Sequence, residues 1–169
     1  MSDLTDYRKM KDNFYLSDAR SPLTEEQKQT FQGLQYYPEN PALRFMLEIE
    51  EFSNKELVSI QTSKGDVRTY ERYGKINFAV DGKPVALTVY KADVDFFLPF
   101  IDSMAGKETY PAGRYLEIEP VENGKFLVDF NMAYNPYCAY NDRWSCPLTP
   151  AENRLKVAIR AGEKLYEAH

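Results

Sequence analysis

Histidine and cysteine are scarce in this sequence: its 169 residues include one histidine and two cysteines. The histidine, His169, is the last residue, a place where chains are usually frayed. A structural zinc site normally needs four Cys or His ligands, and a Ser-His or Cys-His catalytic pair needs a well-placed histidine. We therefore expect no metal site, no histidine-based nucleophilic catalysis and no cofactor.

An excess of positive charge and a long apolar run are also missing. The 21 Lys and Arg residues are outnumbered by 26 Asp and Glu residues, which gives a formal net charge of -5. A nucleic-acid-binding surface needs a basic patch, so we expect no nucleic-acid partner. Nowhere does the sequence have the roughly 18 consecutive apolar residues of a membrane-spanning helix, so we expect no membrane association.

Residues 1–20 carry charges throughout and contain no apolar stretch of signal-peptide length. We therefore expect a cytoplasmic protein. In that reducing compartment Cys138 and Cys146 are expected to be free thiols, although their separation permits a disulfide. The sequence leaves the oligomeric state open.

What the chain does contain is enough apolar and aromatic material for a core, because 43% of its residues are hydrophobic and 14% are aromatic. We predict one domain over residues 1–169, with a helical segment over residues 3–33. Apolar residues recur there at intervals of three and four after Asp3, a suitable N-cap. Thr24 and Gln27 then have the spacing of a capping box, and Gly33 suits the exit of a second, short helix.

From residue 43 onward the apolar period changes to two, which predicts β-strands. The stretches "SKGD" and "DGKP" predict tight turns between them, since Asp-Gly accepts positive φ. Strands joined by such short turns form an antiparallel meander, and closure protects its edges. We therefore predict a mainly β fold, an antiparallel β-barrel or roll over residues 43–169, preceded by one or two short helices. Its alternating residues are Leu43, Phe45, Leu47, Ile49, Val58, Ile60, Ile76, Phe78, Val80, Val85, Leu87, Val89, Phe96, Leu98, Phe100 and, in a last strand, Leu155, Val157 and Ile159.

The hairpin over residues 113–131 admits two registers, which exchange its faces. A two-residue turn at Asn123-Gly124 mixes apolar with acidic side chains. A five-residue loop over residues 120–124 instead groups Arg114 with the apolar residues, and we prefer it. A charge on an apolar face needs a partner, so Arg114 either pairs with a core carboxylate or holds an anion in a cavity.

The stretch "DFNMAYNPYCAYNDRWSC" ends the alternation. Period two places Asp129 and Asn131 on one face and Phe130 on the other. Pro136 then disfavours a helix and favours an extended Asn135. Tyrosine hydroxyls and asparagine amides need hydrogen-bond partners, so we predict a loop tied down over the end of the sheet.

Three stretches together resemble the domain of unknown function 1684 family, which is uncharacterised and mainly prokaryotic. They are "MKDNFYLSDARSPLTEEQKQTFQGLQYYPEN", "PFIDSMAGKETYPAGRYLEIE" and "DFNMAYNPYCAYNDRWSCPLTPAENRLKVAIRAGEK". The resemblance covers nearly the whole chain. It implies a mostly β domain, and it implies no activity.

Three functions stay open on the sequence alone. The first is binding of a small, in one version anionic, molecule in or at the mouth of the barrel, where aromatic walls and a few polar groups are typical of ligand sites. The second is a metal-independent enzyme that uses a carboxylate pair with Arg114. The third is a protein-interaction module with exposed aromatic residues. The candidate ligand-binding residues are Asp102, Tyr110, Arg114, Asp129, Asn131, Tyr134, Asn135, Tyr140, Trp144 and Glu152; no catalytic residue is assigned.

Overall fold

The computed structural model describes residues 3–166, and His169 lies outside this range. Two helices come first, α1 (Asp3–Ser17) and α2 (Glu25–Thr30). The predicted capping box is confirmed: the Thr24 side chain accepts a hydrogen bond from the Gln27 N–H, and the Gln27 side chain accepts one from Thr24 N–H. This reciprocal pair satisfies two N–H groups that the start of a short helix would otherwise leave free.

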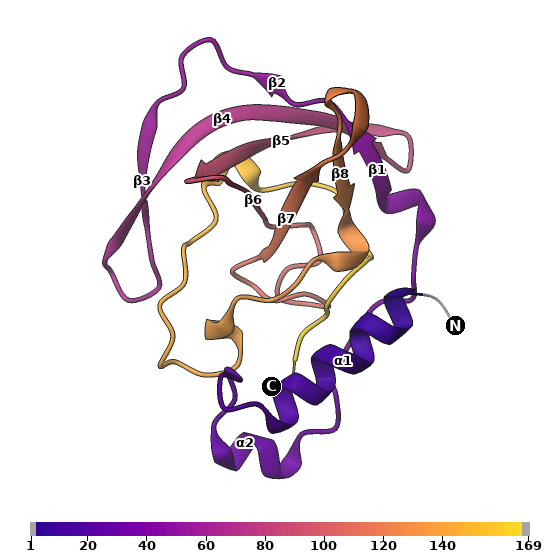
Figure 1. The fold of residues 1–169 in the computed structure, drawn as a ribbon, viewed down its shortest axis with the longest axis vertical. Helices are drawn as coiled ribbons and strands as arrows, with labels where there is room; N and C mark the ends of the chain where they lie inside the picture. The colour runs from indigo at the N-terminus through magenta and orange to yellow at the C-terminus, as the bar shows by residue number, and fades with distance from the viewer. Residues whose placement is uncertain (1–2, 167–169) are drawn as a thin grey trace.

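Eight strands between residues 44 and 129 form one curled antiparallel sheet, which confirms the predicted mainly β class (Figure 1). Its order is β1-β8-β7-β6-β5-β4-β2, and β3 pairs with β4. Strands β4 to β8 are neighbours in the order in which they occur in the chain, as short turns require. Their bounds are β1 (Arg44–Leu47), β2 (Glu50–Glu51), β3 (Leu57–Gln61), β4 (Val67–Val80), β5 (Lys83–Ala92), β6 (Asp95–Phe100), β7 (Arg114–Pro120) and β8 (Phe126–Asp129).

Both ends of this strand order belong to one short segment of chain. β1 pairs with β8 at one edge, and β2, only a few residues later, pairs with β4 at the other edge. Gly74 makes this crossing feasible, because a Cβ at this position would lie 2.6 Å from the Glu50 carbonyl oxygen. The segment from Arg44 to Glu51 thus covers backbone groups that both edges would otherwise expose.

Side chains fill the inside of the curled sheet. Phe130, which is fully buried, lies at its centre, with ring centroids 5.3 Å from those of both Phe78 and Phe100. The alternation seen in the sequence therefore has its expected cause, one buried face per strand. The buried residues of this core are Leu43, Ile76, Phe78, Val80, Leu87, Val89, Leu98, Phe100, Leu116, Ile118, Val128, Phe130, Ala133, Leu155, Ile159 and Ala161.

Turn chemistry explains two of the hairpins. Asp81 and Gly82 both have positive φ, 51° and 78°, so the predicted Asp-Gly turn between β4 and β5 is confirmed. Between β7 and β8 the pairs are Glu119 with Leu127 and Pro120 with Phe126. The loop has the five residues we preferred and keeps the apolar face inside, but it spans residues 121–125, so the predicted register was wrong by two residues.

The predicted last strand was wrong. Leu155 and Ile159 are buried in the core, but their segment is extended coil with an isolated bridge between Ile101 and Arg154. The alternation arose because an extended chain buries every second residue whether or not it pairs along a sheet edge. Side chains take over the role of a neighbouring strand here: Asn153 accepts from the Thr88 N–H and donates to the carbonyls of Thr88 and Pro99, each at 2.8 Å.

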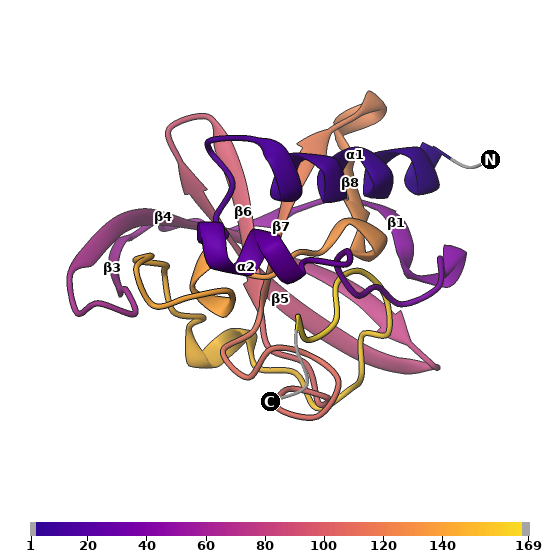
Figure 2. The ribbon, with the colours of Figure 1, turned by 90° about the horizontal axis from the view of Figure 1, so that it is seen from below.

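A second, smaller cluster joins the helices to the sheet. Tyr15 of α1 is buried and makes edge-to-face contacts with Tyr137 and Tyr140, from the stretch rich in tyrosine and asparagine. In Figure 1, α1 lies below the sheet, and α2 follows at the bottom of the molecule; Figure 2 shows the two helices from below. The predicted tie between this loop and the rest of the molecule is confirmed by these contacts.

Candidate functional site

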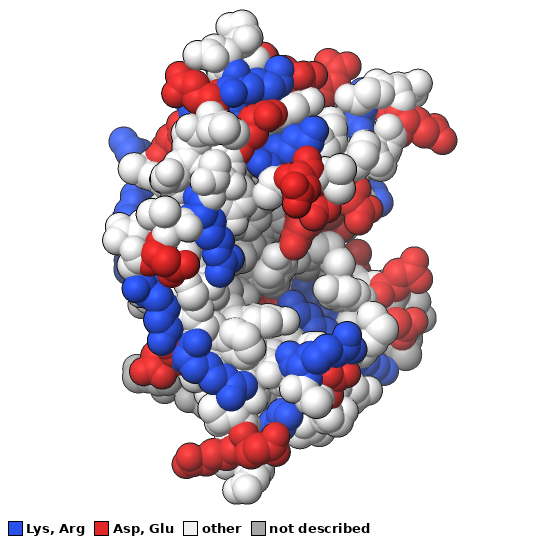
Figure 3. All heavy atoms as spheres, turned by 60° about the vertical axis from the view of Figure 1, so that its left-hand side comes forward, with Lys and Arg blue, Asp and Glu red and all other residues white. Residues whose placement is uncertain are grey.

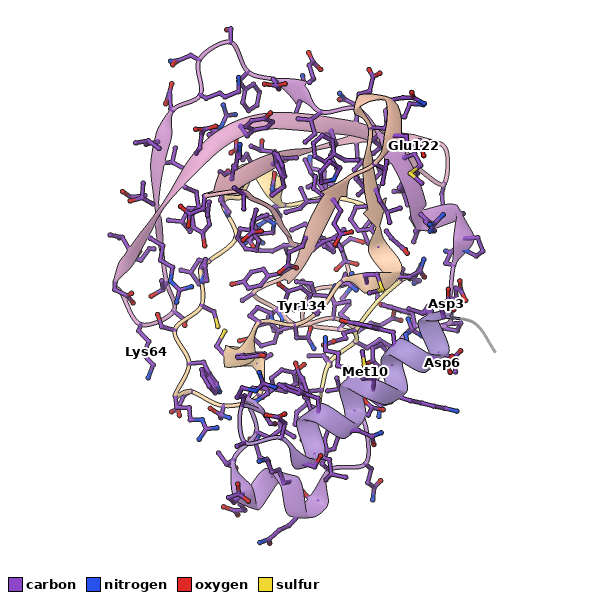
Figure 4. The ribbon with its side chains drawn as sticks, viewed as in Figure 1. Asp3, Asp6, Met10, Lys64, Glu122 and Tyr134 are labelled. Atoms are coloured by element: carbon purple, nitrogen blue, oxygen red, sulfur yellow. The ribbon has the colours of Figure 1, made fainter. Side chains whose placement is uncertain are left out.

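An open groove of about 1000 Å³ lies between α1, the outer face of β7 and β8, and the loop over residues 134–147. Figure 4 shows two of its residues on facing elements, Met10 on α1 and Tyr134 on the loop above the helix in that view. The face in Figure 3 is hollowed near its centre, where uncharged atoms and side chains of both signs border the hollow. The groove is lined by Tyr7, Met10, Lys11, Phe14, Tyr15, Arg68, Tyr115, Leu116, Glu117, Glu119, Leu127, Asp129, Met132, Tyr134, Pro136, Tyr137, Trp144, Ser145, Cys146 and Pro147.

Strand alternation determines which side chains reach this groove. In β7, Ile118 faces the core, whereas Tyr115, Glu117 and Glu119 line the groove; Leu116 is a core residue that also borders it. The open space therefore lies outside the curled sheet. The sequence placed a ligand site in or at the mouth of the barrel; aromatic and aliphatic side chains fill the interior, so the groove is not a cavity inside it.

The aromatic walls of the groove are held by hydrogen bonds to the protein. The Tyr134 hydroxyl donates to Glu117 Oε1 at 2.6 Å, and Trp144 Nε1 donates to the Pro22 carbonyl at 2.9 Å. The Tyr115 hydroxyl donates to the Pro147 carbonyl, and its ring meets that of Tyr134 edge to face. Burial and then the nearby Glu117 carboxylate raise the pKa of Tyr134, so its phenol stays protonated at neutral pH. The ring positions are thus fixed before any ligand arrives.

The basic groups of the groove already have protein partners. Lys11 is paired with the buried Glu163 carboxylate, and Arg68 donates to the Ser145 carbonyl at 2.7 Å. Acidic groups are more numerous in the lining: Glu117, Glu119 and Asp129, of which Asp129 pairs with Arg44 at 3.6 Å. The electrostatic balance of the groove therefore leans toward negative charge.

Arg114 is in the core, away from this groove, with 1% of its side chain exposed. It donates to the carbonyls of Ala161, Glu163 and Ile159 and lies 3.6 Å from the Asp102 carboxylate. Burial lowers the pKa of Arg114, and the Asp102 charge opposes that shift. Of the two roles that the sequence left open, the structure shows pairing with a core carboxylate.

Asp102 completes this cluster from the other side. Its Oδ1 accepts from the Thr109 hydroxyl at 2.7 Å, and its Oδ2 accepts from the Ile159 N–H at 2.8 Å. Together Arg114 and Asp102 hold the backbone of residues 159–163 against the sheet. This is how the chain keeps a charged pair in its core without unpaired polar groups.

Glu163 holds the same segment against the aromatic loop, a role that sequence reasoning missed. Its Oε1 accepts from the Asn135 N–H at 3.1 Å and from the Tyr140 hydroxyl at 2.9 Å, while its Oε2 pairs with Lys11. The only signal in the sequence was the acidic residue beside a glycine in "AGEK", a pattern that also suits an exposed turn. Asn135 and Tyr140, both predicted as ligand-binding, are buried in this network.

Three of the ten candidate residues line the groove: Asp129, Tyr134 and Trp144. Asn131 is not in the lining; it is buried and hydrogen-bonded to Asp129 and to the Asn40 backbone. The rest lie elsewhere: Tyr110 contacts Cys138, Glu152 pairs with Arg72 and Tyr90, and Asp102, Arg114, Asn135 and Tyr140 are in the buried clusters just described.

The arrangement of the residues gives little support to two of the functions considered from the sequence. The enzyme hypothesis needs at least two of Asp102, Arg114, Asp129 and Glu152 at an open pocket, and only Asp129 lines the groove. The interaction hypothesis needs a flat aromatic patch. Within residues 3–166 the strongly exposed large apolar side chains include one aromatic residue, Tyr7.

Among the described residues, no three His, Cys, Asp or Glu side chains come together as a metal site would require. Within the same range, none of the helices has the length and apolar character needed to span a membrane.

The comparisons with known proteins agree with the fold. The model of a family described as "Protein of unknown function (DUF1684)" matches residues 29–164, which confirms the resemblance, although α1 precedes the matched region. One similar solved structure is the solution NMR structure of an uncharacterized protein from gene locus rrnAC0354 of Haloarcula marismortui, whose sequence is 35% identical to this chain. The similarity covers 95% of this chain and 91% of that one, with a TM-score of 0.73. No curated protein matches.

Proposed function

Because the chain belongs to the DUF1684 family, whose description assigns no activity, we propose a function from the groove itself: it binds a small, largely apolar or aromatic molecule. The observation that carries this proposal is an open groove of about 1000 Å³ whose aromatic walls are fixed by protein hydrogen bonds. Small-molecule sites have this character, a mostly apolar lining with a few oriented polar groups and a volume of about 300–1,000 Å³.

The charge of the ligand follows from the groove's partners. The anionic ligand expected from the sequence rested on Arg114, which donates its hydrogen bonds to core carbonyls. Lys11 and Arg68 are engaged as well.

 The lining also contains three acidic residues, Glu117, Glu119 and Asp129. These acids and the aromatic faces favour a neutral or cationic ligand over an anion.

Trp144 offers a direct measurement, because it is the only tryptophan of the chain and lines the groove. Its indole N–H gives one signal in a ¹H–¹⁵N NMR spectrum. We would titrate three naphthylmethyl probes that differ only in charge: the alcohol, the trimethylammonium and the carboxylate. The expected result is that the neutral and cationic probes shift the Trp144 signal in a saturable way, and that the carboxylate binds at least about tenfold more weakly.

Two matched variants test where the probes bind. Met10 and Leu57 are both exposed apolar residues, 62% and 73% accessible, but only Met10 lines the groove. Met10→Gln is expected to weaken binding of the neutral probe several-fold, and Leu57→Gln is expected to leave it unchanged. The proposal fails if none of the probes shifts the Trp144 signal, or if both variants weaken binding equally.

A further inference from the structure

The two cysteines meet beside the groove. Cys138 lies in the short turn Tyr137–Ala139, and its backbone N–H donates to the Cys146 sulfur at 3.3 Å. Both thiols are free. Cys146 is held in place by Ser63, whose hydroxyl accepts from the Cys146 N–H at 3.2 Å and whose own N–H donates to the Cys146 carbonyl at 2.9 Å.

Neutral polar groups lie next to the Cys138 sulfur. The Tyr110 hydroxyl is within hydrogen-bond distance of it, at 3.7 Å, and the Cys146 sulfur is held close by the Cys138 N–H. Donors that converge on one sulfur favour the thiolate over the thiol.

The acidity of the pair agrees with this geometry. The hydrogen bond from Cys146, helped by Tyr110 and Ser63 and opposed by burial, lowers the pKa of Cys138 to about 6. The pKa of Cys146 is raised, first by its hydrogen bond to Cys138 and then by burial. One proton is thus lost readily from the pair, and the second is retained on Cys146.

We propose that Cys138 and Cys146 form a reversible thiol–disulfide exchange site, with Cys138 as the nucleophile and Cys146 as the resolving thiol. The co-reactant is a low-molecular-weight disulfide, RSSR. The Cys138 thiolate attacks one sulfur of RSSR, which forms the mixed disulfide and releases RS⁻. Cys146 then loses its proton and attacks the Cys138 sulfur, which releases the second RS⁻ and closes the Cys138–Cys146 bond. In total, two protein thiols and one RSSR become one protein disulfide and two RSH.

Exposure gives the two sulfurs their order of reaction. Cys138 is half-buried, whereas Cys146 is 7% accessible. An incoming disulfide therefore meets the sulfur that is both more accessible and more readily ionised, and the resolving thiol is already in contact with it.

Mass spectrometry of the full chain treated with oxidised glutathione tests the order. The wild type is expected to lose about 2 Da as the internal disulfide forms, with no lasting adduct. Cys146→Ser, which keeps a hydrogen-bond donor, is expected to accumulate one glutathione on Cys138, and Cys138→Ser is expected to react at least about tenfold more slowly. The proposal is overturned if the wild type keeps a stable adduct, or if Cys138→Ser reacts as fast as Cys146→Ser. The measurement on the wild type is informative even if a variant fails to fold.

The pH dependence of alkylation by iodoacetamide tests the role of the surrounding donors. The titratable groups that face the Cys138 sulfur are Tyr110, Tyr115 and Cys146. In Cys146→Ser the alkylation rate of Cys138 is expected to rise with pH, with a midpoint well below the ordinary thiol pKa of about 8.5. Adding Tyr110→Phe removes one donor and is expected to move the midpoint upward by about one pH unit. A midpoint near the ordinary value in Cys146→Ser, or no shift with Tyr110→Phe, would contradict the proposal.

Discussion

Two arginine–carboxylate pairs attach loops to the sheet, one in the core and one at the surface. Arg114 and Asp102 are 3.6 Å apart with 1% of each side chain exposed, and they hold residues 159–163. Arg72 and Glu152 are closer, 2.8 Å apart, but about a third of each side chain is exposed. Water screens the surface pair, whereas the buried pair depends wholly on protein partners. The longer pair is therefore the one whose loss should matter more.

Removal of Arg114 should have the largest effect on the stability of the protein. Arg114→Met leaves the buried Asp102 charge and three backbone carbonyls without their donor. We expect the free energy of unfolding to fall by about 3–5 kcal/mol, measured by urea denaturation.

A double-mutant cycle shows whether the buried charge is the cause. Adding Asp102→Asn to Arg114→Met removes the unpaired charge, so the double variant should lose clearly less than the sum of the two single losses. Arg72→Met is the matched surface control, with an expected loss below about 1 kcal/mol. If Arg114→Met costs no more than Arg72→Met, the contrast between the two pairs is false.

The backbone of the segment that Arg114 holds offers a second test. Gly162 has a φ of +80°, and a Cβ there would lie 2.7 Å from the Ala133 carbonyl oxygen. Gly124, in the β7–β8 loop, has a φ of +73° but nothing within 4 Å of its Cβ position. Gly124→Ala should cost about 1 kcal/mol of unfolding free energy for its backbone conformation alone. Gly162→Ala should cost about 2 kcal/mol more, and equal losses would mean that the tight packing around Gly162 yields easily.

The surface pair should show its small contribution as a pH effect. The hydrogen bond from Arg72, followed by that from Tyr90, lowers the pKa of Glu152 below its ordinary value of 4.5. Folding thus favours the ionised carboxylate, and this contribution is present above the ordinary pKa and is lost as the pH falls through the lowered one. Since the pair is one-third exposed, Glu152→Gln should cost below about 1 kcal/mol at pH 7.

The measurement compares urea unfolding of wild type and Glu152→Gln at neutral pH and at about pH 3, where the difference should be smaller. Other carboxylates titrate in both proteins and cancel in the comparison. A difference that stays constant between the two pH values would mean that Glu152 contributes by packing rather than by charge.

Local sequence signals predicted the parts of the fold that local physics decides. The Thr24–Gln27 capping box and the Asp81–Gly82 turn were read correctly because each depends on a few neighbouring residues. The strand at residues 155–159 was predicted wrongly, since alternation reports burial and not strand pairing. Asn153 supplies the hydrogen bonds there, and one buried asparagine side chain has no distinctive pattern in a sequence.

The candidate site was less predictable, because it depends on how distant segments are placed. Tyr134 and Trp144 were expected to line a ligand site, and they do line the groove. The wall from α1, with Met10 and Phe14, was missed since no sequence pattern states which face of the sheet a helix will approach. Arg114 was identified as a residue that needs a partner, but the sequence could not choose between a core carboxylate and a bound anion.

The strand arrangement also has a consequence for the order in which the molecule can assemble. β1 pairs with β8 through residues as far apart in the chain as Phe45 and Val128, and Arg114 binds carbonyls of residues 159–163. Contacts between such distant segments form late, because a long loop must close first, and they therefore make folding slower. During synthesis, β1 leaves the ribosome long before its partner exists. The meander from β4 to β7 can form as the chain emerges, whereas closure of the sheet must wait for β8 and completion of its core for residues 155–161.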